Sequence, residues 1–193
     1  MQKYIYTLLF ASLFLLSGCG EDEASEDSVA TAAQGWHYPG RDCLACHNLD
    51  LGVDKHLLLA GTVYKDSNVT NQDDINNVCG GELLVEILDS SFNPVYNSKE
   101  FKDSSSSGYN GKGNIFILQR KLRLLSAGTY ALRITDANGT IMAVSNSSHK
   151  FTSQDYDINS PADWDNRLSC NSCHRVGGAT DPLYIQVNKT LCQ

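Results

Sequence analysis

The sequence predicts a mainly β protein: an antiparallel sandwich flanked by loop-rich segments that carry short helices. Two observations lead to this class. Short runs of β-branched or alternating apolar residues follow one another through the middle of the chain, with turn residues between them at intervals of about 8–12 residues. Glycine, serine and asparagine are frequent, and only 41% of the 193 residues are hydrophobic, so loops must accompany the core.

Residues 1–18 have the pattern of a targeting segment. Lys3 precedes an apolar run from Ile5 to Leu16, which is too short and wrongly flanked to span a membrane. The run ends in Leu16-Ser17-Gly18-Cys19, which resembles the cleavage site of bacterial lipoprotein signal peptides. This resemblance implies that Cys19 becomes the first residue and carries lipid. An ordinary signal peptide with an unrelated cysteine is the alternative.

Residues 19–35 are expected to form a flexible acidic tether. Five acidic residues cluster among small ones without apolar periodicity, and like charges repel one another. The formal net charge of the chain is −7, and the sequence lacks the cluster of basic residues that nucleic-acid binding needs. A nucleic-acid partner is therefore not expected.

The sandwich is placed at residues 58–150. Its expected strands are Ala60–Tyr64, Glu82–Leu88, a third that starts at Val95-Tyr96, Asn114–Leu118, Thr129–Ile134 and Thr140–Val144. Asp136-Ala137-Asn138-Gly139 is typical of a turn, and residues 65–80 are typical of a long polar loop. A short helix over 117–126 is the alternative for one run, because Leu122 and Leu125 are three positions apart.

One motif occurs twice, in the segments 36–57 and 151–193. It reads Cys43-Leu44-Ala45-Cys46-His47 in the first and Cys170-Asn171-Ser172-Cys173-His174 in the second. C-x-x-C-H is the attachment pattern of c-type haem. Two thiols on one helical turn can both form thioethers with one porphyrin, and the following histidine can bind the iron. We therefore predict two haem c groups, held covalently by Cys43, Cys46, Cys170 and Cys173, with His47 and His174 as iron ligands.

Two other chemistries use paired cysteines. A thioredoxin-type dithiol expects a βαβ context, which neither motif has. A zinc ribbon places its two C-x-x-C pairs about 15–20 residues apart, whereas these pairs are separated by most of the chain. Around the motifs, Ser160 to Trp164 is typical of a short helical start, and Pro182 to Val187 of a last edge strand.

Three further histidines, His37, His56 and His149, could supply the sixth ligands of the two irons. Two haems with paired histidine ligands need two of these three, and the sequence does not decide which. Met142 is the only methionine after the targeting segment, and its strand pattern favours core packing over iron ligation.

A combination of motifs resembles a known family. His37-x-x-Gly40-x-Asp42-Cys43-Leu44-x-Cys46-His47, then Ala60-Gly61-Thr62-Val63-Tyr64, then the second C-x-x-C-H is similar to dihaem c-type lipoproteins of bacteria that respire extracellularly or reduce metals. The resemblance implies an Ig-like or transthyretin-like sandwich, as in carboxypeptidase regulatory domains, between the haem motifs. The long 65–80 loop and the pair Cys79 and Cys192 depart from it.

The resemblance also implies a function. We expect a cytochrome that relays electrons at the outer membrane, on its periplasmic or cell-surface side, held there by its lipid. Its partners would be other cytochromes or extracellular electron acceptors, and self-assembly stays open. A haem enzyme with an open coordination position, and a zinc-binding adhesin or filament subunit, are the alternatives.

Two cysteines remain after the others are assigned. Lipid accounts for Cys19 and haem for four more of the seven, which leaves Cys79 and Cys192. An exported chain meets an oxidising compartment, so we predict that these two form a disulfide. Two unpaired thiols are the alternative.

Overall fold

The computed structural model describes residues 38–81, 83–98, 113–121, 125–145, 149–152, 154–163, 166, 168–187 and 189–192. The predicted targeting segment and tether, and with them Cys19 and His37, lie outside these residues. Within the described ranges, no helix is long and apolar enough to cross a membrane.

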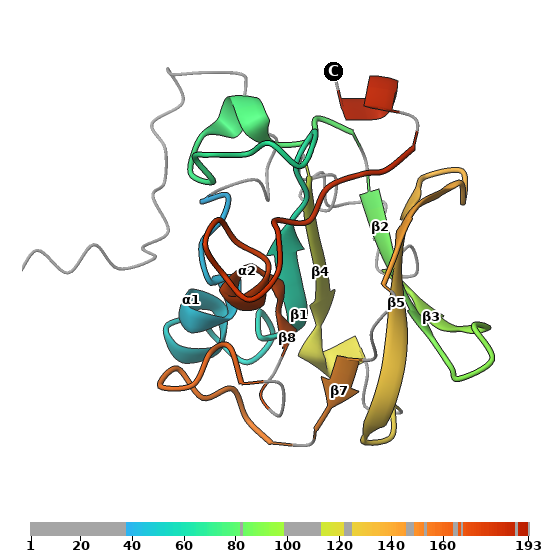
Figure 1. Ribbon diagram of the computed structural model, residues 1–193. Helices are drawn as coiled ribbons and strands as arrows, with labels where there is room; N and C mark the ends of the chain where they lie inside the picture. Colours follow the sequence, from blue (N-terminus) through green and yellow to red (C-terminus); the bar gives the residue numbers. More distant parts are fainter. Residues whose placement is uncertain are drawn as a thin grey trace, which may run out of the picture.

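The chain is mainly β and forms two sheets (Figure 1). The first has the order β4 (Asn114–Leu118), β1 (Leu57–Thr62), β8 (Leu168–Ser169). The second has the order β3 (Pro94–Asn97), β2 (Leu83–Leu88), β5 (Gly128–Asp136), β6 (Ile141–Val144), and β7 (His149–Phe151) also pairs with β5. Each of these pairings is antiparallel except that of β1 with β8, which is parallel.

The two sheets share one apolar core. Leu59 and Ile117 enter it from the first sheet, and Val85, Ile87 and Leu132 enter it from the second. All six residues of β1 are buried, because its other face lies under the helices that carry the motifs. A strand covered on both faces has a continuous apolar run instead of an alternating one.

The longer helix starts at the first motif. In α1 (Cys43–Leu49), the Asp42 carboxylate caps the first turn by accepting the N–H groups of Leu44 at 3.2 Å and Ala45 at 3.4 Å. Leu44 is fully buried and packs with Leu57 and Ala60 of β1. The described residues also include α2 (Cys170–Cys173) and the 3₁₀ turns η1 (Ile75–Asn77), η4 (Gln119–Lys121) and η5 (Lys189–Cys192).

Four local predictions differ from the structure. The strand expected over Ala60–Tyr64 lies earlier, at Leu57–Thr62. Pro182 to Val187 is not a strand: Leu183 O accepts the N–H of Tyr64, which lies beyond the end of β1, and Gln186 N donates to Met142 O of β6. The alternative helix at 117–126 is reduced to the 3₁₀ turn η4 within its described part. Residues 160–163 form a turn instead of a helical start.

Cys79 and Cys192 form a disulfide, with their Cα atoms 4.2 Å apart. Both residues are buried at the edge of the core. The bond fastens η5 beside the start of β2, where Gly81 packs against Leu191. The end of the described chain is thus tied to the second sheet.

Candidate functional site

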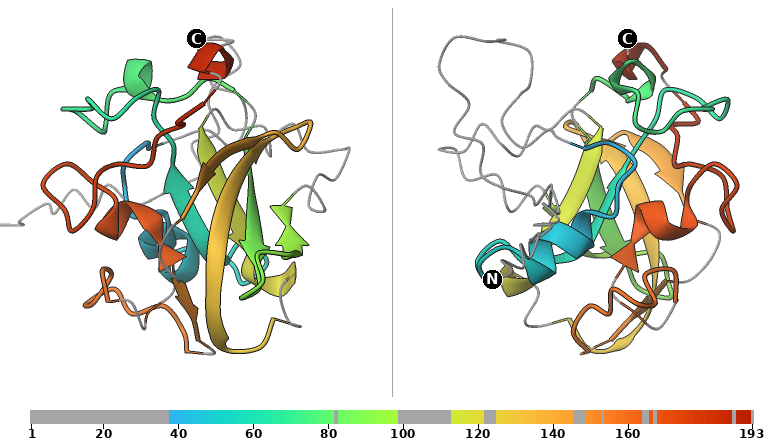
Figure 2. Two further views of the ribbon diagram at one scale, coloured as in Figure 1. Left: turned by 45° about the vertical axis from the view of Figure 1, so that its right-hand side comes forward. Right: turned by 90° about the vertical axis from the view of Figure 1, so that its left-hand side faces the viewer.

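The two C-x-x-C-H motifs lie side by side. α1 carries Cys43 and Cys46, and α2 carries Cys170 and Cys173, so each pair occupies one helical turn. Figures 1 and 2 show both helices next to each other beside the first sheet. Both also contact β1, which therefore serves as their common support.

A direct hydrogen bond joins the residues that precede the two motifs. The Ser169 hydroxyl donates to Asp42 Oδ1 at 2.7 Å, across 127 positions of sequence. Ser172 Oγ lies 2.8 Å from Ser169 Oγ and donates to it, because the Ser169 proton is already used. Asp42 and Ser169 directly precede Cys43 and Cys170, so this bond holds the first cysteine of each motif near the other.

Tyr156 adds a second contact to the same carboxylate. Its hydroxyl donates to Asp42 Oδ2, and the tyrosine is buried beside Leu44. Burial raises the pKa of Tyr156, and the Asp42 carboxylate that accepts its proton raises it further. Asp42 therefore caps α1 and binds two other segments at once.

The side chain of Asn171, inside the second motif, hydrogen-bonds to the backbone of β1 just beyond the last residue pair of β1 and β8. Its Oδ1 accepts the N–H of Thr62 at 2.9 Å, where a further β8 residue would otherwise pair. Its Nδ2 donates to the Arg41 carbonyl at 2.7 Å. Asn171 and Thr62 are both buried and hydrogen-bonded, so this contact fixes how the second motif lies against β1.

The polar loop before β2 holds the chain that leaves the second motif. Gln72 Oε1 accepts the N–H of Val176 at 2.7 Å, and its Nε2 donates to the His174 carbonyl at 3.3 Å. The Tyr64 hydroxyl donates to the Gln72 carbonyl at 3.0 Å and so fixes the loop in turn.

The motif histidines make matching hydrogen bonds. His47 Nδ1 lies 3.0 Å from the Lys55 carbonyl, and His174 Nδ1 lies 3.0 Å from the Asp181 carbonyl. A carbonyl only accepts, so Nδ1 carries the proton in both rings, and in the neutral ring the lone pair is on Nε2. Metal-binding histidines are oriented in this way by their outer hydrogen bonds.

The first cysteine of each motif has a raised thiol pKa. Burial raises the pKa of the Cys43 thiol to about 12, and the Asp42 carboxylate adds to the rise. Burial also raises the pKa of the Cys170 thiol to about 12, and a negative charge on Cys43 adds to it because the two are close. Reactive thiols have lowered pKa values, so the shifts of Cys43 and Cys170 run opposite to those of a reactive thiol.

Cys46 differs from the other motif cysteines, because it is disulfide-bonded in the structure. Cys43, Cys170 and Cys173 are free thiols. Haem attachment through Cys46 therefore requires that its thiol be reduced when the haem is joined.

The other candidate ligands lie in different places. His149 is next to His174, with ring centroids 6.5 Å apart. His56 precedes β1, and its Nε2 lies 3.2 Å from the Leu51 carbonyl. Met142 is buried in the core, as its strand pattern predicted. His37 lies outside the described residues.

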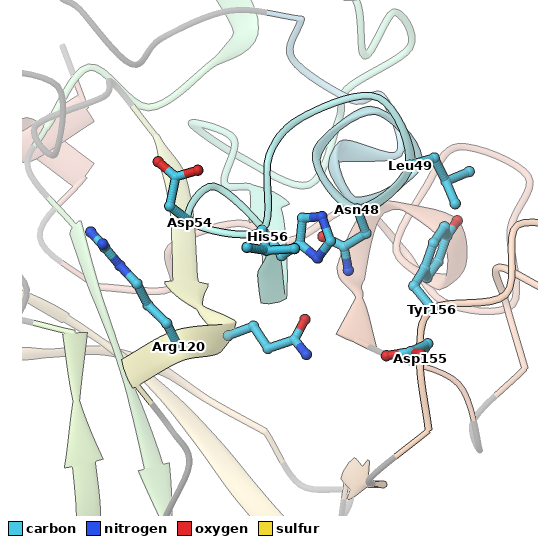
Figure 3. A pocket seen from close by; sticks show the side chains of 9 residues that line it. Asn48, Leu49, Asp54, His56, Arg120, Asp155 and Tyr156 are labelled. Atoms are coloured by element: carbon cyan, nitrogen blue, oxygen red, sulfur yellow. The ribbon is translucent and has the colours of Figure 1, made fainter.

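A pocket of about 710 Å³ lies beside the C-terminal end of α1. Figure 3 shows His56 next to Asn48, with Asp54 and Arg120 on one side and Tyr156 on the other. None of the lining residues belongs to a C-x-x-C-H motif. The pocket is therefore separate from the motif thiols.

Sequence reasoning missed the residues that join the motifs. Asp42, Gln72 and Asn171 act between segments far apart in sequence, and only the cap position of Asp42 had a local signal. Among the described residues, no three His, Cys, Asp or Glu side chains gather as a metal site. A haem iron takes four ligands from its porphyrin, so that finding does not bear on haem.

In comparisons with protein-family models, curated proteins and solved structures, nothing matches this chain.

Proposed function

We propose that this protein is a dihaem c-type cytochrome that relays electrons at the outer membrane or cell surface. Cys43 and Cys46 would hold one haem and Cys170 and Cys173 the other, with His47 and His174 on the irons. A bound haem iron changes between ferric and ferrous states and so carries one electron at a time.

One observation carries the proposal: both motif histidines place Nδ1 3.0 Å from a backbone carbonyl. The same arrangement in two copies of the motif orients both rings to offer Nε2 to a metal. The Asp42–Ser169 hydrogen bond supports the relay, because it holds the two attachment sites beside each other. Electrons would then pass between neighbouring haems within one rigid unit.

The location and the finer fold belong to the same proposal. Lipid on Cys19 and the acidic tether would hold the cytochrome at the membrane surface, facing other cytochromes or an extracellular acceptor. The two facing sheets support an Ig-like or transthyretin-like sandwich, to which the parallel strand β8 adds the second motif.

A redox titration tests the relay. The full chain is produced in cells that attach haem c, and optical spectra are recorded at stepped potentials. We expect two one-electron transitions and low-spin ferric spectra, because both irons have two protein ligands. A protein without covalent haem would contradict the proposal. A high-spin ferric haem that turns over peroxide would favour an open-site enzyme instead.

A further inference from the structure

His149 and His174 come together from separate parts of the chain. Their ring centroids lie 6.5 Å apart, and the ring planes are inclined by 25°. His174 ends the second motif, and His149 is the first residue of β7. β7 contacts β8, which leads directly into Cys170, so the fold itself brings His149 to the second motif.

The separation fits two imidazoles on opposite sides of one iron. An imidazole nitrogen binds a first-row metal at about 2 Å. The centre of the ring lies a little over 1 Å from that nitrogen, so two rings on one metal have centres about 6–6.5 Å apart. The observed 6.5 Å agrees with this span in distance, and the two stacked rings would have to turn their Nε2 atoms toward a shared iron when haem binds.

Both rings are oriented through Nδ1. His174 Nδ1 lies 3.0 Å from the Asp181 carbonyl, and His149 Nδ1 lies 3.5 Å from Ser145 Oγ. The Asp181 carbonyl can only accept, so His174 carries its proton on Nδ1 and presents Nε2 to a metal. In His149 the same tautomer donates from Nδ1 to the Ser145 hydroxyl and likewise presents Nε2. His56 has the opposite arrangement, because its Nε2 is the atom that contacts a carbonyl.

A rigid element holds His149. It pairs with Tyr130 in the ladder between β7 and β5, and Phe151, two residues further on, is buried in the core. Tyr130 and Phe151 pack edge to face, with centroids 5.5 Å apart. A ligand on a packed strand is positioned more precisely than one on a loop.

We propose that His149 is the distal ligand of the second haem, on the opposite side of the iron from His174. This inference rests on the proposed function and extends it by assigning one of three histidines to one haem. His37 and His56 remain for the first haem.

Substitution of His149 in the haem-loaded full chain tests this assignment. Three variants are compared: His149→Ala, His149→Met and the control Lys150→Ala, which changes the next residue of the same strand on its opposite face. Intact mass gives the haem number, and ferric optical and electron paramagnetic resonance spectra give the spin state. Potentiometry gives the two reduction potentials.

We expect His149→Ala to turn one of the two haems high-spin, and added imidazole to return it to low-spin. His149→Met should keep both haems low-spin and raise one potential, because thioether ligation favours ferrous iron. Lys150→Ala should match the parent protein in all readouts.

The outcomes distinguish a failure of the proposed function from a failure of the ligand assignment. A parent protein without covalent haem ends the proposed function itself. Two attached haems that both stay low-spin in His149→Ala overturn only the ligand assignment. If His149→Ala does not fold, the potentials of His149→Met decide, and two unchanged potentials overturn it.

Discussion

At the scale of single residues, Asp42 connects the first motif to the rest of the molecule. Its carboxylate caps α1, accepts the Ser169 hydroxyl before the second motif and accepts the Tyr156 hydroxyl. Because Ser169 and Tyr156 are buried, loss of the carboxylate leaves their donors without this acceptor.

Asp42→Ala is expected to lower the free energy of unfolding by about 3–7 kcal/mol, since a lost cap costs about 1 kcal/mol and each of the two buried donors left without this acceptor about 1–3 kcal/mol. Asp74→Ala is the matched control, because Asp74 caps η1 and bonds only within its own turn at Asn76. It should cost about 1 kcal/mol. Urea unfolding measures both, and equal losses would show that Asp42 is only a cap.

Tyr64 and Tyr156 predict an alkaline limit to stability. Burial raises the pKa of Tyr64 from 10.0 to about 12, and burial with the Asp42 contact raises the pKa of Tyr156. The unfolded chain releases these protons near pH 10 while the folded chain keeps them. In the haem-loaded protein the motif cysteines would be thioethers that do not titrate, so stability should be level below about pH 9.5 and fall as pH rises through 10 to 12. Urea unfolding at stepped pH checks this, and Tyr156→Phe should weaken the fall. A flat profile up to pH 11 would contradict it.

At the scale of elements, β1 can support both motifs because it carries a glycine where α2 approaches. A Cβ on Gly61 would lie 2.5 Å from Cys170 Cβ and 3.1 Å from its Sγ. The Cβ atom of Cys170 cannot move without moving α2, so α2 can lie this close to β1 only because residue 61 has no side chain.

Gly61→Ala should lower the free energy of unfolding by about 1–3 kcal/mol through overpacking. It should also reduce haem attachment at the second motif and leave the first unchanged, because the clash involves Cys170 alone among the cysteines. Gly128→Ala in β5 is the control, since its new Cβ meets the Tyr130 ring at an ordinary 3.4 Å. Unfolding curves and haem mapping by peptide mass measure both. Intact attachment at both motifs in Gly61→Ala would refute the expected displacement of α2.

The Cys79–Cys192 disulfide should stabilise the fold. It closes a loop of 113 positions, and removal of a native disulfide typically costs about 2–5 kcal/mol. The double variant Cys79→Ser/Cys192→Ser should lose about that much in urea unfolding. A thiol titration of unfolded, unreduced parent protein provides the second check, and reactive Cys79 and Cys192 thiols would rule out the bond.

Sequence patterns predicted the longer strands because each has its own local signal. β4 matches its predicted limits and β2 ends at its predicted last residue, whereas β1 covers Leu57–Thr62 where Ala60–Tyr64 was predicted. β8 has only two residues, too few for any periodicity, and its partner β1 is more than a hundred positions away. The segment 182–187 looked like a strand, but its hydrogen bonds divide between Tyr64, beyond the end of β1, and Met142 of β6.

The helical turns that carry the two cysteine pairs were predictable from the sequence, and the way the two motifs meet was not. The motif spacing is local, so both helical cysteine pairs were expected before the fold was known. The proximity of His149 to His174 depends on how β7 and β8 meet, which no local pattern encodes. Counting histidines could therefore name His149 as a candidate without assigning it a haem.

At the scale of the whole molecule, the second motif is built into the sheet. β8 joins the first sheet directly before Cys170, and the first motif packs on the same sheet through Leu44. The arrangement gives both attachment sites one rigid support, which fits a relay of electrons between fixed centres. The formal net charge of the chain is −7. If the proposed cytochrome function holds, this charge would favour positively charged redox partners.

The intact mass of the processed protein tests the central claim most directly. The full chain is produced in cells with an active haem-attachment system, and denaturation before the measurement removes any group that is not covalently bound. The account predicts a mass that exceeds the processed polypeptide by two haems, with peptide maps that place one on Cys43 and Cys46 and the other on Cys170 and Cys173. A mass equal to the polypeptide without haem would contradict it.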